Sequence, residues 1–189
     1  MDTVKVMTQV IGQTKTIVDG VGEDELAKPT LCTEWTVRDV INHITGGATM
    51  FAECISDGSV PDDRMAQLFG GDNLGNDYKG AFTRATEKVM ATFDEPGMAE
   101  KMVKLPFGEM PAGIALNIAI FDVTTHAADI AQATGQTIAD KELLETALAV
   151  GRELVGPDMR KPGVFDPERE VGTDAGVAER LLAFAGRKV

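Results

Sequence analysis

The amino-acid sequence predicts an all-α protein built as a bundle of helices. Apolar residues recur every three or four positions through several long segments, as on helices with one buried face. Aromatic residues make up only 5% of the 189 residues, so the core depends on aliphatic side chains and nine methionines, as in stacked helices. A chain of this length can bury a sizeable core, and we expect one domain over residues 1–189.

The first two helices have recognisable boundaries. Helical periodicity predicts a helix over residues 3–19, which Gly20 and Gly22 end. The stretch "WTVRDV" marks the start of a second helix, because Thr36 is a favourable N-cap and Asp39, three residues later, can bond back to the cap.

A long connection and a third helix follow. Residues 58–75 are rich in Gly, Asp and Pro, which favours a connection between antiparallel neighbours. The third helix is expected to begin after Asn76 or Asp77 and to stop before Pro96. The segment "KMVKLPFGEMPAG" alternates and contains two prolines, which indicates an extended segment or one short strand.

The fourth helix is expected to run from Pro111 to Gly135, and it is apolar on nearly every side. Its length raises the question of a membrane span. Asp122, His126 and Asp129 argue against one, because each acid within a bilayer would cost about 2.5 kcal/mol or more. The pattern therefore predicts the central helix of a bundle.

The last part of the chain completes the bundle. A fifth helix is expected after Asp140, and residues 155–189 form a tail that packs on the bundle. The tail contains one short helix within "AGVAERLLAFAG".

Composition also limits the partners. The formal net charge is -12, and no cluster of Lys and Arg occurs, which argues against nucleic acid and against an anionic membrane. The N-terminus lacks the apolar block of a signal peptide, so we expect a cytoplasmic protein. Cys32 and Cys54 are then expected as reduced, buried thiols.

The candidate site is a set of titratable residues in "AIFDVTTHAADIAQATG". Asp122 and His126 stand one helical turn apart, with Cβ atoms about 6 Å from each other, which suits two ligands of one ion. The other histidine of the chain, His43, lies beside the apolar face of the second helix and can supply a third ligand. Two imidazoles and one carboxylate with an open position describe a catalytic site for Zn²⁺ or a similar divalent ion. A plain hydrogen bond between Asp122 and His126 within the core would satisfy the same residues, and the pattern leaves both alternatives open.

Two further residues lie near this constellation. Asp129 follows on the same helical stripe, either as a catalytic acceptor that orients His126 or as half of an ion pair with an arginine such as Arg38, and the pattern favours the ion pair. Cys32 either faces the site or packs as a small hydrophobic residue, and packing is the more common role.

Four stretches of the chain, "PTLCTEWTVRDVINHITGG", "LPFGEMPAG", "FDVTTHAADIAQATGQ" and "RLLAFAGR", resemble the actinobacterial branch of the DinB superfamily related to mycothiol-dependent maleylpyruvate isomerase. The resemblance implies a four-helix bundle with up-down-down-up topology and the metal ligands His43, Asp122 and His126. Asp122 departs from the pattern, because the resemblance implies Glu at this position in the isomerases and His in the bacillithiol transferase relatives. We expect no counterpart of the isomerases' separate C-terminal domain within residues 1–189.

The resemblance implies a divalent ion that activates a small thiol such as mycothiol for attack on an electrophilic small molecule. Zinc is the first expectation, with nickel, cobalt or manganese as alternatives. The function expected is thus a thiol-dependent S-transferase or an isomerase-like enzyme. Two alternatives remain open: a metal-dependent hydrolase with the same ligands, and a non-catalytic binding protein that a metal stabilises. The protein is expected to be a monomer or a homodimer.

Overall fold

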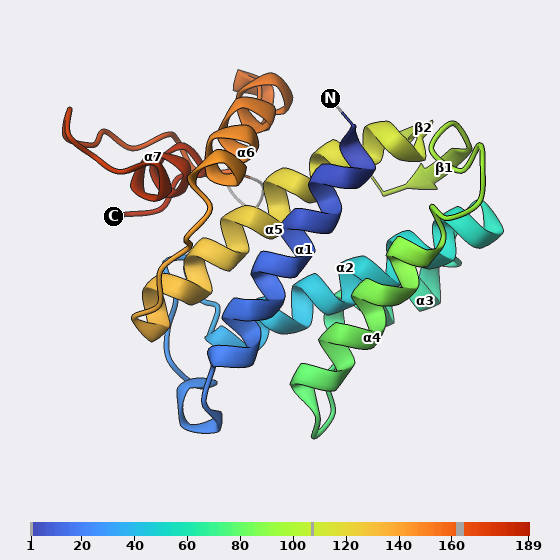
Figure 1. Cartoon of the computed structure of the whole chain (residues 1–189), viewed down its shortest axis with the longest axis horizontal. Coiled ribbons are helices and arrows are strands. Elements are labelled where there is room, and N and C mark those ends of the chain that lie inside the picture. Colours follow the sequence, from blue (N-terminus) through green and yellow to red (C-terminus); the bar gives the residue numbers. More distant parts are fainter. Residues whose placement is uncertain (1, 107, 162–164) are drawn as a thin grey trace.

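The computed structural model describes residues 2–106, 108–161 and 165–189 of the chain. Four long helices form the bundle: α1 (Thr3–Gly20), α2 (Val37–Asp57), α4 (Tyr78–Ala91) and α5 (Ala112–Thr134). Helices α1 and α5 run in one direction and pack against each other, while α2 and α4 pack together and run the opposite way (Figure 1). This arrangement confirms the all-α bundle with up-down-down-up topology.

Helix boundaries follow the expected caps. The Thr36 side chain accepts a hydrogen bond from the backbone N–H of Asp39, and the Asp39 carboxylate accepts one from the backbone N–H of Thr36, so α2 begins where the sequence predicted. The Asp77 side chain caps α4 by accepting a hydrogen bond from the backbone N–H of Gly80. Pro111 is the N-cap of α5 and not its first helical residue, and Gly135 ends α5 in the left-handed conformation that glycine adopts without strain.

The connection between α2 and α4 differs from the prediction, because it contains helix α3 (Asp62–Gly70). Helix α3 has nine residues, of which only Leu68 is buried, and it lies in a stretch whose Gly, Asp and Pro content is typical of a loop. The Asn42 side chain on α2 donates to the carbonyl of Gly71 and accepts from the backbone N–H of Asn73, which fixes the end of α3 against α2. These hydrogen bonds between α2 and the end of α3 therefore support a helix that the composition did not predict.

The extended segment before α5 forms two strands, where the sequence predicted at most one. Strands β1 (Met102–Leu105) and β2 (Gly108–Pro111) pair as an antiparallel hairpin in which Met102 faces Pro111. Phe107, at the expected turn, lies outside the described residues. The hairpin packs on α2 and the start of α5, and it closes one end of the bundle.

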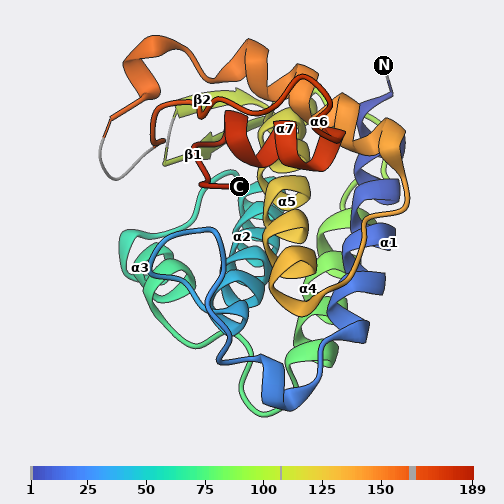
Figure 2. The ribbon, with the colours of Figure 1, turned by 90° about the vertical axis from the view of Figure 1, so that its left-hand side faces the viewer.

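The tail covers α5 from the side opposite α2 and α4. Helix α6 (Lys141–Leu154) packs on α5, and α7 (Val177–Phe184) packs on α6 and α5 (Figure 2). Short 3-10 turns lie at Glu23–Glu25 and Pro157–Met159. By length and composition α5 could cross a membrane, but 72% of its most apolar window is buried inside the structure, as in a core helix.

Candidate metal centre

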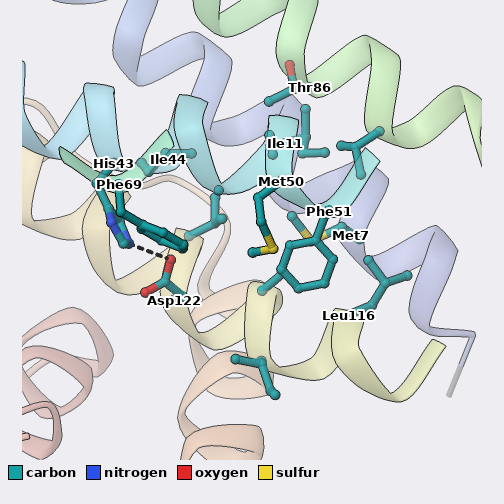
Figure 3. Close-up of a pocket in the computed structure, with 16 residues that line it drawn as sticks. Met7, Ile11, His43, Ile44, Met50, Phe51, Phe69, Thr86, Leu116 and Asp122 are labelled. Carbon is teal, nitrogen blue, oxygen red and sulfur yellow. Dashed lines mark hydrogen bonds and ion pairs between the residues drawn. The ribbon is translucent and has the colours of Figure 1, made fainter. Parts of the chain in front are cut away.

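Two helices bring the candidate ligands together in the middle of the bundle. His43 lies in the second turn of α2, and Asp122 and His126 lie on successive turns of α5. Figure 3 shows His43 and Asp122 pointing toward each other between these helices. The three residues that the sequence singled out as metal ligands therefore meet at one place.

Their separations are short. His43 Nε2 lies 3.3 Å from Asp122 Oδ2, and His126 Nε2 lies 3.5 Å from Asp122 Oδ1. One ligand atom from each residue lies within 4.8 Å of the other two. Ligand atoms held about 2.1 Å from one ion at tetrahedral angles are about 3.4 Å apart. The spacing and the donor types both suit a divalent ion bound by two imidazoles and one carboxylate.

Asp129 and Arg187 hold His126 in place. Asp129 is fully buried, and its Oδ2 lies 3.1 Å from His126 Nδ1. Arg187, from the end of the tail, donates to both oxygens of Asp129, at 3.2 Å through Nε and 2.8 Å through Nη2. The guanidinium thus neutralises Asp129 and fixes the carboxylate that orients the histidine.

This contact determines which nitrogen of His126 faces Asp122. An ionised carboxylate only accepts hydrogen bonds, so His126 donates to Asp129 through Nδ1. In the neutral ring Nε2 then carries a lone pair directed at a second acceptor, Asp122 Oδ1. Two facing acceptors repel each other unless a cation or a proton lies between them. The geometry therefore suits a metal ion, and a protonated imidazole is its competitor.

The charges around the centre shift several pKa values. Partial loss of water contact raises the pKa of Asp122, but His43 and His126 outweigh this effect and hold it far below its usual range. Burial lowers the pKa of His43, whereas the charge and hydrogen bond of Asp122 raise it, and the net shift is upward. Burial raises the pKa of Asp129, yet the hydrogen bonds from His126 and Arg187 lower it overall. Both acids are therefore ionised at neutral pH.

The single tryptophan covers the two histidines. The Trp35 ring stacks on His126, with centroids 5.5 Å apart and an angle of 21° between the planes, and its centroid lies 4.9 Å from that of His43. Trp35 directly precedes the N-cap of α2, at the end of the helix where His43 lies in the second turn. It shields the nitrogen-bearing rings from solvent on one side.

Cys32 lies behind His126 and faces Asp129. Its sulfur, a His126 nitrogen and an Asp129 oxygen lie within 4.8 Å of one another. Burial raises the pKa of the thiol to about 11, so Cys32 is a protonated thiol at neutral pH. Both cysteines are free; Cys54 is buried as the sequence predicted, whereas Cys32 is only half-buried.

The structure corrects one assignment and adds two residues. Arg38 does not pair with Asp129; it binds Asp72 at 3.1 Å, and Arg187 is the partner of Asp129. Trp35 and Arg187 belong to the surroundings of the centre, although the sequence analysis gave neither a role there. The available signal was the resemblance, because Trp35 stands inside the stretch "PTLCTEWTVRDVINHITGG" and Arg187 ends the stretch "RLLAFAGR".

Fold and site together define a DinB-like helical bundle with a group of His and Asp side chains that could hold a metal ion. The model of the family described as the mycothiol maleylpyruvate isomerase N-terminal domain matches residues 7–131. The chain belongs to this family. The match includes His43, Asp122, His126 and Asp129, and it ends before Arg187.

Relatives and solved structures agree with this membership. Uncharacterized protein Rv0738 of Mycobacterium tuberculosis is 37% identical over 175 residues, which cover 92% of this chain and 91% of the relative. The crystal structure of the mycothiol-dependent maleylpyruvate isomerase matches with a TM-score of 0.65 at 15% identity, over 79% of this chain and 66% of that one. A histidine-to-alanine mutant of the isomerase matches with a TM-score of 0.67 at 12% identity, over 86% and 71%.

At 15% and 12% identity, the similarity to the isomerase structures shows a shared fold. The chain spans just under two thirds of the length of the first isomerase structure it matches.

Proposed function

We propose that this protein is a divalent-metal-dependent enzyme that joins a small thiol, such as mycothiol, to an electrophilic small molecule. The observation that supports it is the meeting of His43, Asp122 and His126 at the spacing of ligands around one ion. Membership of a family named for a mycothiol-dependent isomerase supports the thiol as co-substrate. Zinc is the ion proposed first, with nickel, cobalt and manganese as alternatives.

The three side chains would hold the ion and leave a position open for the sulfur. A divalent ion bound there would lower the pKa of the thiol, so that the sulfur reacts as a thiolate at neutral pH. Asp129 keeps the proton of His126 on Nδ1, which directs the Nε2 lone pair toward the centre. Trp35 excludes water from the imidazoles, which strengthens the electrostatic interactions of the site.

Cys32 is not the nucleophile of this proposal. Its thiol groups with His126 and Asp129 and not with His43 and Asp122, and burial raises its pKa, which keeps it protonated. A protonated thiol is a poor nucleophile. We therefore assign Cys32 a packing role.

Metal analysis comes first. The purified chain, incubated with zinc and desalted, should hold one ion, and the His43→Ala, Asp122→Ala and His126→Ala variants should hold much less. A wild-type preparation with well under one ion per chain would refute the proposal.

A cobalt-loaded sample separates thiol chemistry from the hydrolase alternative. Titration with mycothiol should change the visible spectrum of the cobalt, because the sulfur enters its coordination sphere. An unchanged spectrum would favour a metal-bound hydroxide and a hydrolase. A protein that holds the metal but turns over neither kind of substrate would be the non-catalytic binding protein.

A further inference from the structure

A partly open cavity adjoins the candidate metal centre. Its volume is about 140 Å³, and it lies between α1, α2, α4 and α5 with His43 and Asp122 in its wall (Figure 3). The cavity separates the two apolar cores of the protein: Ile44 in its wall belongs to one core, and Met50 to the other. Phe69 of α3 also lines it and is 45% exposed, so the wall reaches the surface beside His43.

Most of the cavity wall is apolar, and its charged residues lie at one end. Apart from His43 and Asp122, the lining side chains are apolar except for Thr86. The Thr86 hydroxyl donates to the carbonyl of Phe82 on its own helix at 2.9 Å, so its proton is already engaged. Among the described residues that line the cavity, none is Lys or Arg. The charged and titratable groups are thus confined to the end next to the candidate metal centre.

The size of the cavity limits what it can hold. A cavity of about 150 Å³ lined by Leu, Ile and Phe binds benzene in another protein. The present cavity has nearly the same volume and is lined by residues of the same type, such as Ile11, Phe51 and Leu116. One six-membered ring or a branched alkyl group of that size would fill it.

Charge argues against an anionic occupant. A carboxylate buried among apolar side chains needs a cation or hydrogen-bond donors, and the cavity beyond His43 offers neither. Maleylpyruvate, named as the substrate of the isomerase, carries two carboxylates, so it matches this cavity poorly.

We propose that the cavity binds the apolar, uncharged body of the electrophilic substrate, a group about the size of one benzene ring, and places its reactive end beside His43 and Asp122. This assignment rests on the proposed function, because it makes the cavity the electrophile's half of the same site. The sugar-bearing thiol mycothiol is too large and too polar for this cavity and would approach the centre from outside it.

The binding test uses fluorobenzene as a probe and follows its ¹⁹F NMR signal with the zinc-loaded full chain. The signal should broaden and shift as fluorobenzene binds. Toluene should displace it, whereas maleate at the same concentration should not. Displacement by maleate as effective as that by toluene, or no binding of fluorobenzene, would overturn the proposal.

Substitutions at two glycines, one in the cavity wall and one outside it, test whether fluorobenzene binds in the cavity. Gly47 on α2 lines the cavity, and a Cβ atom there would meet nothing within 4 Å, so Gly47→Leu has room to fill the space. Gly12 on α1 is equally unobstructed but does not line this cavity, so Gly12→Leu is the control. Gly47→Leu should weaken fluorobenzene binding at least about tenfold and Gly12→Leu less than about twofold.

Gly47→Val is measured alongside, and its smaller side chain should cause a smaller loss. Equal binding by the wild type and both Gly47 variants would place the probe elsewhere and overturn the assignment.

Zinc content separates this inference from the proposed function. A protein that holds zinc but does not bind fluorobenzene refutes the cavity assignment alone. A protein that binds fluorobenzene within the cavity but holds no zinc refutes the proposed metal- and thiol-dependent function, while the cavity keeps its preference for uncharged apolar groups.

Discussion

Replacing Asp129 by Asn should weaken both the fold and the metal centre. Asp129 has no exposed side-chain surface, and only 12% of its partner, Arg187, is exposed. Breaking a buried ion pair by removing one partner costs about 3–5 kcal/mol, because the other charge stays buried without compensation. The Asn carbonyl can still accept one hydrogen bond from Arg187, so we expect a loss near the lower limit, about 3 kcal/mol of unfolding free energy.

The same substitution acts on metal affinity through His126. Asp129 keeps the proton of His126 on Nδ1, and the loss of such a partner typically weakens metal binding about 10–100-fold. This corresponds to about 1.4–2.7 kcal/mol of metal-binding free energy. In saturating zinc the variant should therefore lose more stability than it loses with a chelator present.

Urea unfolding with zinc and with chelator measures the first effect, and competition with a chelating dye measures the zinc dissociation constant. Asp166→Asn is the matched control, since Asp166 is 57% exposed and lies 3.8 Å from Arg169. Exposed pairs contribute at most about 1 kcal/mol, so this variant should resemble the wild type in both assays. A zinc affinity of Asp129→Asn within about twofold of the wild type would refute the role of Asp129 in orienting His126.

Three further predictions concern the metal, the packing and the pH dependence. Zinc at about 100 times its dissociation constant should raise the unfolding free energy by about 2.7 kcal/mol and the Tm by about 5–11 °C, measured by scanning fluorimetry. His43→Ala should abolish this rise and leave the metal-free Tm nearly unchanged; an equal drop in both forms would make His43 a purely structural residue. Gly46→Ala should lose about 1–3 kcal/mol in urea unfolding, because its Cβ would lie 2.2 Å from the backbone oxygen of Leu68. Gly47→Ala, which meets nothing within 4 Å, should gain about 0.5–1 kcal/mol, and a similar change in the two variants would contradict the packing of α2 on α3. Hydrogen bonds from the backbone of Leu74 and Gly75 and from Arg38 lower the pKa of Asp72, so its stabilising contribution is present above an ordinary pKa of about 3.9 and is lost as the pH falls through the lowered value. The stability difference between wild type and Asp72→Asn should thus shrink as the pH falls from about 6 to 3, and a difference that grew would refute this sign.

Local rules predicted most of the fold. The caps at Thr36, Asp77 and Asp140 depend on residues within three positions of the helix start, so the sequence displays them directly. The strand pair before α5 was partly missed, because strand pairing joins residues across a turn, and alternation alone does not reveal a partner. Helix α3 was missed because its stability depends on Asn42, which lies outside the segment.

The candidate ligands were predictable for a different reason. A carboxylate and an imidazole spaced four residues apart in an apolar helix need a partner, and the chain contains only one other histidine. The partner of Asp129 was not predictable, because Arg187 is 58 positions away and the sequence offers several arginines of equal merit. The predicted pairing of Asp129 with Arg38 was wrong because long-range packing determines which arginine reaches Asp129.

Arg187 also bears on the charge balance at the centre. It neutralises Asp129, so Asp122 is the one carboxylate there whose charge is left to balance that of an ion. A divalent cation, one carboxylate and two neutral imidazoles would leave one positive charge, which a single anionic ligand cancels. Next to an apolar cavity this neutral combination is favoured over a charged one, because uncompensated charge in a poorly solvated place is costly. A thiolate and the hydroxide of the hydrolase alternative are both such ligands, so the pairing of Arg187 with Asp129 would favour a singly charged anion at the open position.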